Sequence, residues 1–166
     1  MKKLFLILML CIALVFNINC KTNAQATGFL DEATKNKMSD LLNGGITLII
    51  YQNGSVDFSQ ERGIAPLFKM VENKKIKNAY AFDKVVGRAA AFLYAKGEAD
   101  YVFAQTMSIP ATKILRKYGI KYDAKTITKE IVNRKNTGLC PFEELVKNST
   151  NADTAYNLIK KELNNK

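Results

Sequence analysis

The segment AYAFDKVVGRAAAFLYAKGEADYVFAQTMSIPATKILRKYG, residues 79–119, alternates between two kinds of pattern. Short runs rich in β-branched and aromatic residues, at 79–82 and 101–104, predict strands. Between them, Val85 to Lys96 carries a wide apolar face, which predicts a helix. Ser108 is a favoured N-cap residue and predicts the start of a second helix. Strands that alternate with helices in this way predict parallel pairing within one sheet.

The flanking residues extend this pattern into a whole domain. Before the segment we expect a helix, two strands joined by the strong hairpin turn Asn53-Gly54, and a second helix, at residues 29–42, 46–51, 56–58 and 66–73. After it we expect an edge strand, a short helix, a polar loop and two closing helices, at residues 120–127, 128–132, 133–139, 141–146 and 152–163. The prediction is an α/β fold: one domain over residues 27–166, built as a three-layer α/β/α sandwich with a mixed sheet and an N-terminal hairpin.

The first residues predict an export signal. Lys2 and Lys3 precede an unbroken 13-residue apolar run from Leu4 to Phe16, and secretory signals have an apolar core of about 7–15 residues. A helix that spans a membrane needs about 20. The small residues of Ala24-Gln25-Ala26 predict cleavage after Ala26, and Thr22-Asn23-Ala24 offers a second site. The sequence therefore predicts a periplasmic or extracellular protein from which residues 1–26 are removed.

Cys20 gives the same segment another interpretation, as a lipoprotein signal. Such a signal has a small residue directly before the cysteine and an aliphatic residue at the third position before it. This chain has Asn19 and Asn17 at those positions. A cleaved signal without a lipid anchor therefore fits the sequence better.

The charge of the chain favours anionic partners. Lys and Arg number 25 against 15 Asp and Glu, a net charge of +10. Removal of the signal would leave +7, because it takes Lys2, Lys3 and Lys21 and no acid with it. A basic surface attracts phosphates, membrane headgroups and cell-wall polymers. Recognition of nucleic acid is not predicted, since no RNA or DNA motif is present and export argues against it.

The inventory of reactive residues excludes several classes of enzyme. The chain has no histidine, and only Cys140 of its three cysteines lies beyond the export segment. One cysteine cannot form an internal disulfide, and zinc sites draw mostly on Cys and His. Serine and cysteine hydrolases that use a histidine base are excluded as well. The sequence implies no metal and no cofactor.

Two segments have an unusual composition. DKVVGRAAA, residues 83–91, is expected to run from a strand end into a helix start, and NRKNTGLCPFE, residues 133–143, is expected to form a loop that leads into a helix. In this order and spacing, both segments resemble a small prokaryotic family of unknown function that has a cytidine deaminase-like fold. The resemblance covers roughly residues 41–163, and the export signal is the departure from it.

The resemblance implies the fold of a deaminase without its chemistry. Active zinc deaminases carry His-x-Glu at one helix start and Pro-Cys-x-x-Cys at the next. Here the first of those positions has Asp83 and Lys84, and the second has Ser108 followed by Ile109-Pro110. No residue matches a zinc ligand or the proton-shuttling glutamate, so the fold does not carry the activity.

The first motif and the helix after it supply candidate ligand-binding residues. Strand ends and helix N-termini form the natural crevice of a parallel sheet, and helix N-termini attract anions. Lys84 would add positive charge there, and Ser108 opens the neighbouring helix. Asp83 would accept hydrogen bonds from ribose hydroxyls or cap the helix. Gly87 is expected to permit close packing of helix on sheet.

The second motif supplies the other candidates. The Arg134 guanidinium suits a phosphate or carboxylate, or would pair with Glu143 or Glu130. Cys140 lies before a helix N-terminus, where a thiol is activated, or is a buried and inert residue. The candidate ligand-binding residues in this motif are Asn133, Arg134, Thr137, Gly138, Cys140 and Glu143.

Three functions follow from these observations. The leading hypothesis is a metal-free domain that binds a nucleotide-like or other anionic small molecule. The second is a thiol enzyme with Cys140 as nucleophile and Asp83 or Glu143 as its base. The third is an envelope interaction module whose basic surface contacts anionic polymer or lipid.

Overall fold

The computed structural model describes residues 31–165. Its helices are α2 (Glu32–Asn43), α3 (Ala65–Glu72), α4 (Arg88–Lys96), α5 (Ile109–Lys117), α6 (Pro141–Leu145) and α7 (Ala152–Asn164). Its strands are β1 (Leu48–Gln52), β2 (Ser55–Ser59), β3 (Tyr80–Val86), β4 (Tyr101–Ser108) and β5 (Lys121–Thr128). The expected export segment and its cleavage sites lie outside the described residues. Within them, no helix is long and apolar enough to cross a membrane.

The five strands form one mixed sheet in the order β2-β1-β3-β4-β5. β1 pairs antiparallel with both β2 and β3, whereas β3, β4 and β5 run parallel. Asn53 and Gly54 both have positive φ, 50° and 80°, which is the geometry that a two-residue hairpin turn requires. The mixed α/β sheet and its N-terminal hairpin are therefore confirmed.

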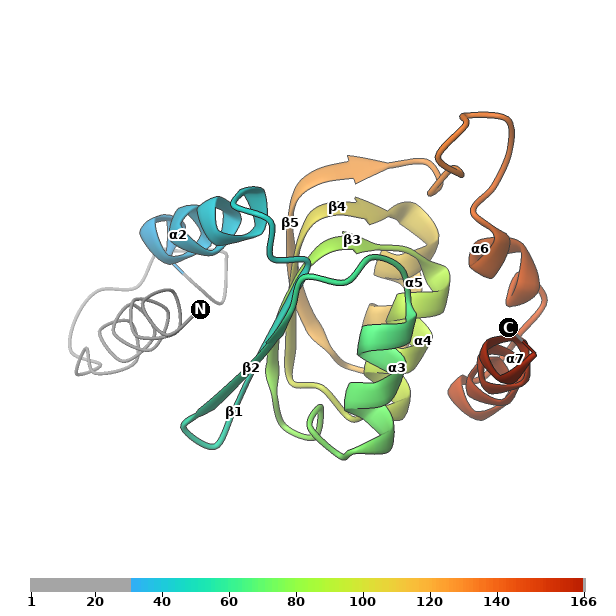
Figure 1. Cartoon of the computed structure of the whole chain (residues 1–166), viewed down its shortest axis with the longest axis horizontal. Helices are drawn as coiled ribbons and strands as arrows, with labels where there is room; N and C mark the ends of the chain where they lie inside the picture. Colours follow the sequence, from blue (N-terminus) through green and yellow to red (C-terminus); the bar gives the residue numbers. More distant parts are fainter. Residues whose placement is uncertain (1–30, 166) are drawn as a thin grey trace.

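The helices cover both faces of the sheet (Figure 1). α2 lies on one face, and α3, α4 and α5 lie on the other. α6 and α7 pack over the outer side of α4 (Figure 1). This arrangement fits the predicted three-layer sandwich.

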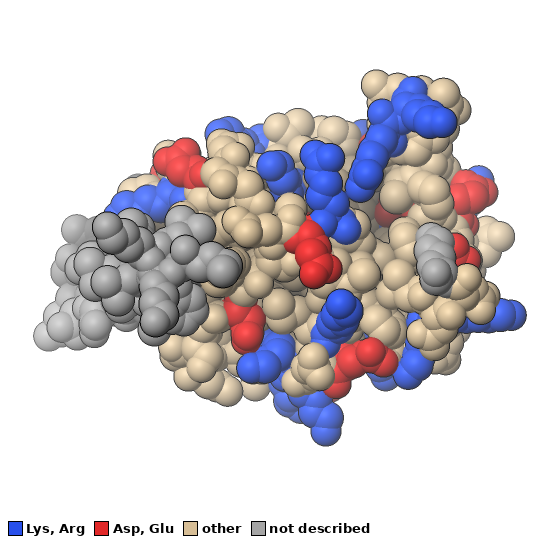
Figure 2. Space-filling model, viewed as in Figure 1, with Lys and Arg blue, Asp and Glu red and all other residues tan. Residues whose placement is uncertain are grey.

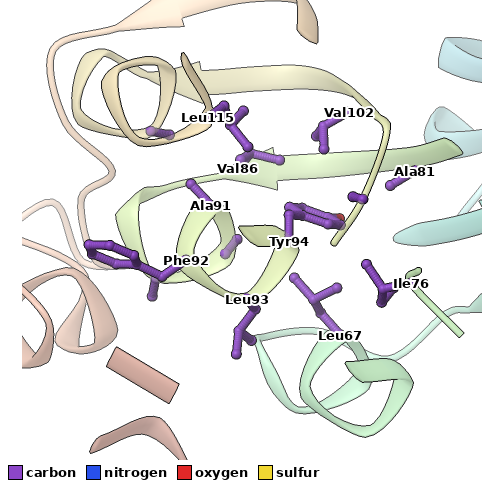
Figure 3. Packing of buried hydrophobic residues seen from close by; sticks show 14 of the residues in the cluster. Leu67, Ile76, Ala81, Val86, Ala91, Phe92, Leu93, Tyr94, Val102 and Leu115 are labelled. Atoms are coloured by element: carbon purple, nitrogen blue, oxygen red, sulfur yellow. The ribbon is translucent and has the colours of Figure 1, made fainter. Parts of the chain in front are cut away.

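Helix α4 is the centre of the larger hydrophobic core. Its residues from Ala89 to Tyr94 are all buried, because the sheet covers one side of the helix and α7 covers the other. Figure 3 shows Leu67 of α3, Val86 of β3, Val102 of β4 and Leu115 of α5 gathered around it. A helix enclosed in this way needs side chains of different sizes to fill the space around it, which fits the mixture of Ala, Phe, Leu and Tyr in AAAFLY.

Polar side chains fix α2 on the opposite, aromatic face of the sheet. The amide of Gln105 donates to the backbone oxygen of Ser39 at 2.9 Å and to Oδ1 of Asn43 at 2.9 Å. Lys84 Nζ donates to the backbone oxygen of Leu42 at 3.1 Å. Beneath α2, Met38 packs among the aromatic side chains of this face. The helix therefore has a defined position despite covering the sheet alone among the described residues.

The structure corrects two expected elements. β3 continues to Val86, so the first motif begins inside a strand, and α4 begins only at Arg88. The short helix expected at 128–132 is wrong, because β5 continues to Thr128, which pairs with Ser108 of β4. In its place, Val132 forms an isolated bridge with Leu139, which closes the polar loop of the second motif.

Candidate functional site

A cleft of about 780 Å³ opens at the carboxyl end of β3. Five segments form its walls: the start of β1, the β2–α3 connection, the end of β3, the start of α4, and the second motif with the residues just before it. The lining residues lie within 47–48, 61–67, 83–85, 87–90, 131–135 and 140–143. A second hollow of about 470 Å³ lies at the opposite end of the parallel strands and contains neither motif. The larger cleft is the candidate site because residues of both motifs line it.

Asp83 lies in this cleft with its carboxylate held in place. Oδ2 accepts a hydrogen bond from the Tyr94 hydroxyl at 2.7 Å, and Oδ1 accepts one from the Val85 N–H at 3.1 Å. Part of the residue still contacts solvent. Burial nevertheless raises the pKa of Asp83 to about 6, although both hydrogen bonds act in the opposite direction. Asp83 is thus a strand residue that faces the cleft, and the expectation that it caps the following helix is wrong.

Glu143 reaches across the cleft to the first turn of α4. Its carboxylate is almost fully buried and accepts from the Ala89 N–H at 3.2 Å. Burial raises the pKa of Glu143, and the hydrogen bond from Ala89 together with the charge of Arg88 lowers it. A Cβ on Gly87 would lie 2.8 Å from Cδ of Glu143. Gly87 therefore makes room for Glu143, and not for the sheet as expected.

Two residues of the expected site have structural contacts instead. Ser108 is fully buried and caps α5, accepting from the Ala111 N–H at 3.2 Å, and it does not line the cleft. Its predicted N-cap position is confirmed. Lys84 borders the cleft, but its ammonium bonds to the end of α2 and lies at no helix start.

The loop of the second motif is organised by its own first residue. Oδ1 of Asn133 accepts from the N–H groups of Lys135 and Thr137 at 3.0 and 3.1 Å. The Asn133 N–H donates to the backbone oxygen of Gly138 at 2.9 Å. Asn133 borders the cleft, whereas Thr137 and Gly138 do not. These three residues shape the loop and leave its basic side chains to face outward.

Three basic side chains stand at the cleft without a partner in the part of the chain that the structure describes. Arg62 comes from the β2–α3 connection, and Arg134 and Lys135 come from the loop. All three are exposed, and none forms an ion pair among residues 31–165. Figure 2 shows Lys and Arg side chains on the lobe that projects before α6 and on the surface beside it. The expected pairing of Arg134 with Glu143 or Glu130 is not formed.

Cys140 also borders the cleft, where it is half-buried. Its N–H donates to the backbone oxygen of Ile131 at 2.9 Å, which fixes the chain just before α6. Of the two bases suggested for a thiol enzyme, Glu143 is already bonded to α4. A catalytic thiol stays a prediction.

The sequence pattern missed two contributors to the site. Arg62 lies in an irregular stretch with no motif, so only the fold brings it to the cleft. Tyr94 lies on the apolar face of its helix, where an aromatic residue is expected to be part of the core. The only indication of its role in the sequence is its hydroxyl, because a buried tyrosine hydroxyl usually has a hydrogen-bond partner. Among residues 31–165, no group of three or more His, Cys, Asp or Glu side chains could hold a metal ion.

Comparison with known proteins agrees with the fold. The chain is similar to the crystal structure of a DUF1893 family protein (TM1506) from Thermotoga maritima, with a TM-score of 0.71 and 20% identity over 84% of this chain and 97% of that one. At this identity the likeness shows the fold alone. The cytidine deaminase-like label stays a prediction, and no curated protein matches. A family model described as TM1506, domain of unknown function (DUF1893), matches residues 36–163. This match confirms the prediction, made from the two motifs, of a family of unknown function. The chain therefore belongs to the DUF1893 family.

Proposed function

We propose that the domain binds a nucleotide-like or other small anionic molecule in the cleft beside β3, without a metal. The observation that carries this proposal is the set of three exposed, unpaired cations, Arg62, Arg134 and Lys135, around one hollow. A cleft of about 780 Å³ lies within the range of about 300–1,000 Å³ for small-molecule sites. Guanidinium groups from two separate segments, the β2–α3 connection and the loop of the second motif, suit a phosphate or carboxylate.

Part of the cleft lining is apolar. Leu48, Leu67, Val85 and Phe142 line the cleft, and such walls suit a ring or another flat apolar body. The first turn of α4 does not supply the anion site, because Glu143 already occupies the Ala89 N–H. The anionic group therefore belongs at the three exposed cations, and the rest of the molecule lies against the apolar lining.

Thermal shift at low salt tests the proposal. Nucleoside monophosphates and sugar phosphates in excess are expected to raise the melting temperature by about 5 °C. Arg62→Ala and Arg134→Ala should each weaken binding about tenfold, because each removes a charge-assisted hydrogen bond. Lys113→Ala is the matched control, since Lys113 is exposed on α5 and lies outside the cleft. Equal loss in the control and the cleft variants, or no shift with any ligand, would contradict the proposal.

We also propose that the domain acts outside the cytoplasm. The support is the sequence of residues 1–26, with its positive start, its apolar run and its small residues before the cleavage site. The protein expressed in a bacterial host should appear in the periplasm or medium, with an N-terminus at residue 27 by peptide sequencing. Retention of Met1 in the cytoplasmic fraction would contradict export, and a lipid on Cys20 would establish the anchored alternative.

A further inference from the structure

Asp83 is a charged group between two apolar neighbours in the adjacent strands. Its register partners are Leu48 on β1 and Ala104 on β4. No Lys or Arg among the described residues forms an ion pair with it. Burying a carboxylate without a cation beside it costs folding free energy. A function in ligand binding would explain why Asp83 lies on the cleft wall.

The hydrogen bonds of Asp83 leave part of its acceptor capacity unused. An ionised carboxylate offers about four lone-pair sites, two on each oxygen. The Tyr94 hydroxyl occupies one on Oδ2, and the Val85 N–H occupies one on Oδ1. Each oxygen therefore accepts one of these two hydrogen bonds and can accept another, and the two oxygens belong to the same carboxylate.

Tyr94 and Val85 also fix the orientation of those free sites. Tyr94 is fully buried and its pKa is raised well above the usual value by burial and by Asp83, so its hydroxyl stays a donor. With a pKa of about 6, Asp83 is mostly ionised at pH 7.5 and only accepts. Two adjacent acceptors held in this way match two adjacent donors on one ligand.

We infer that the ligand of this cleft presents a pair of adjacent hydrogen-bond donors to Asp83, in addition to its anionic group. The inference deepens the proposed function and depends on it. Within a nucleotide, two places offer such a pair: the ring N–H and amino group of guanine, and the 2′ and 3′ hydroxyls of ribose. The ligand class is thus a guanine nucleotide or a ribonucleotide, with the same donor chemistry.

Isothermal titration with four ligands separates these sources. The ligands are guanosine monophosphate, inosine monophosphate without the amino group, 2′-deoxyguanosine monophosphate without one hydroxyl, and ribose 5-phosphate without the base. Guanosine monophosphate should bind about tenfold more tightly than the analogue that lacks one of the two donors bound by Asp83. A loss with inosine identifies the guanine edge, and a loss with the deoxynucleotide identifies the ribose.

Asp83→Asn should abolish this tenfold preference, because an amide replaces one acceptor by a donor. Arg134→Ala should weaken all four ligands about equally and keep the preference. Asp123→Asn is the matched control, since Asp123 also accepts from a tyrosine, Tyr101 at 2.8 Å, but lies outside the cleft.

The outcomes distinguish the two claims. Binding that depends on Arg134, with equal affinity for all analogues or with a preference that survives Asp83→Asn, overturns the inference and leaves the proposed function standing. Absence of binding for all four ligands, ribose 5-phosphate included, overturns the proposed function and this inference with it.

Discussion

Replacement of Gly87 by alanine is expected to lower the free energy of unfolding by about 3 kcal/mol. The backbone at Gly87, with φ −98° and ψ −173°, is open to any residue, so the cost comes from space. The new methyl would overlap the carboxyl group of Glu143 and would lie 3.0 Å from Cγ1 of Ile131. Glu143 must move, and the Ala89 N–H loses its buried partner.

Thermal and urea unfolding measure this loss, which corresponds to a fall in melting temperature of about 10 °C. Gly138→Ala is the control, because the nearest atom to its new Cβ is 3.9 Å away, and it should change stability by less than about 0.5 kcal/mol. In a Glu143→Ala background the Gly87→Ala substitution should cost about 1 kcal/mol, a coupling of about 2 kcal/mol. Equal costs in both backgrounds would show that Glu143 is not the reason for this glycine.

The difference in unfolding free energy between Asp83→Asn and the wild type is expected to shift in favour of the variant as the pH rises. Burial raises the pKa of Asp83 to about 6 from an ordinary value of 3.8. Between these two values the folded protein holds more protons than the unfolded chain, so wild-type stability falls as the pH increases through this window. The variant has no such titration. Its stability relative to the wild type should therefore improve by about 2 kcal/mol between pH 4 and pH 7.5, less than the full shift because Asp83 is partly solvated.

Urea unfolding of both proteins across this pH range measures the difference directly. Tyr94→Phe provides a second test, because the Tyr94 hydroxyl is the strongest hydrogen bond that lowers the pKa of Asp83. Its loss should raise that pKa further and move the window to higher pH. Asp83 accepts from the Tyr94 hydroxyl of α4 and the Val85 N–H of β3, and the Lys84 backbone also lowers its pKa. Its register partners are Leu48 on β1 and Ala104 on β4. Parallel stability curves for Asp83→Asn and the wild type would contradict the assignment.

The order of strands and helices followed from the sequence because local signals agreed with the fold. The Asn53-Gly54 turn and the Ser108 cap lie where expected. The boundary between β3 and α4 was misplaced because Val85 and Val86 suit a strand as well as a helix. Pairing with Thr106 and Met107 of β4 decided in favour of the strand, and such pairing is a property of the tertiary structure.

The two motifs predicted the walls of the cleft better than the role of each residue. They identified Asp83, Arg134, Cys140 and Glu143, which all line it. The sequence could not show that Glu143 turns inward to α4, because that contact joins residues 54 positions apart. The sequence also predicted an anion at the start of α4, but Glu143 already accepts a hydrogen bond from the Ala89 N–H there.

The enclosure of α4 sets an order in which the domain can be completed. The outer side of this helix is covered by α7, whose Ala155 and Ile159 are among the last buried residues of the chain. During synthesis, the sheet and α4 are made well before α7 exists to cover them. The half-built domain therefore keeps an open apolar side, and full cooperativity comes only when α7 has been made and packs against α4.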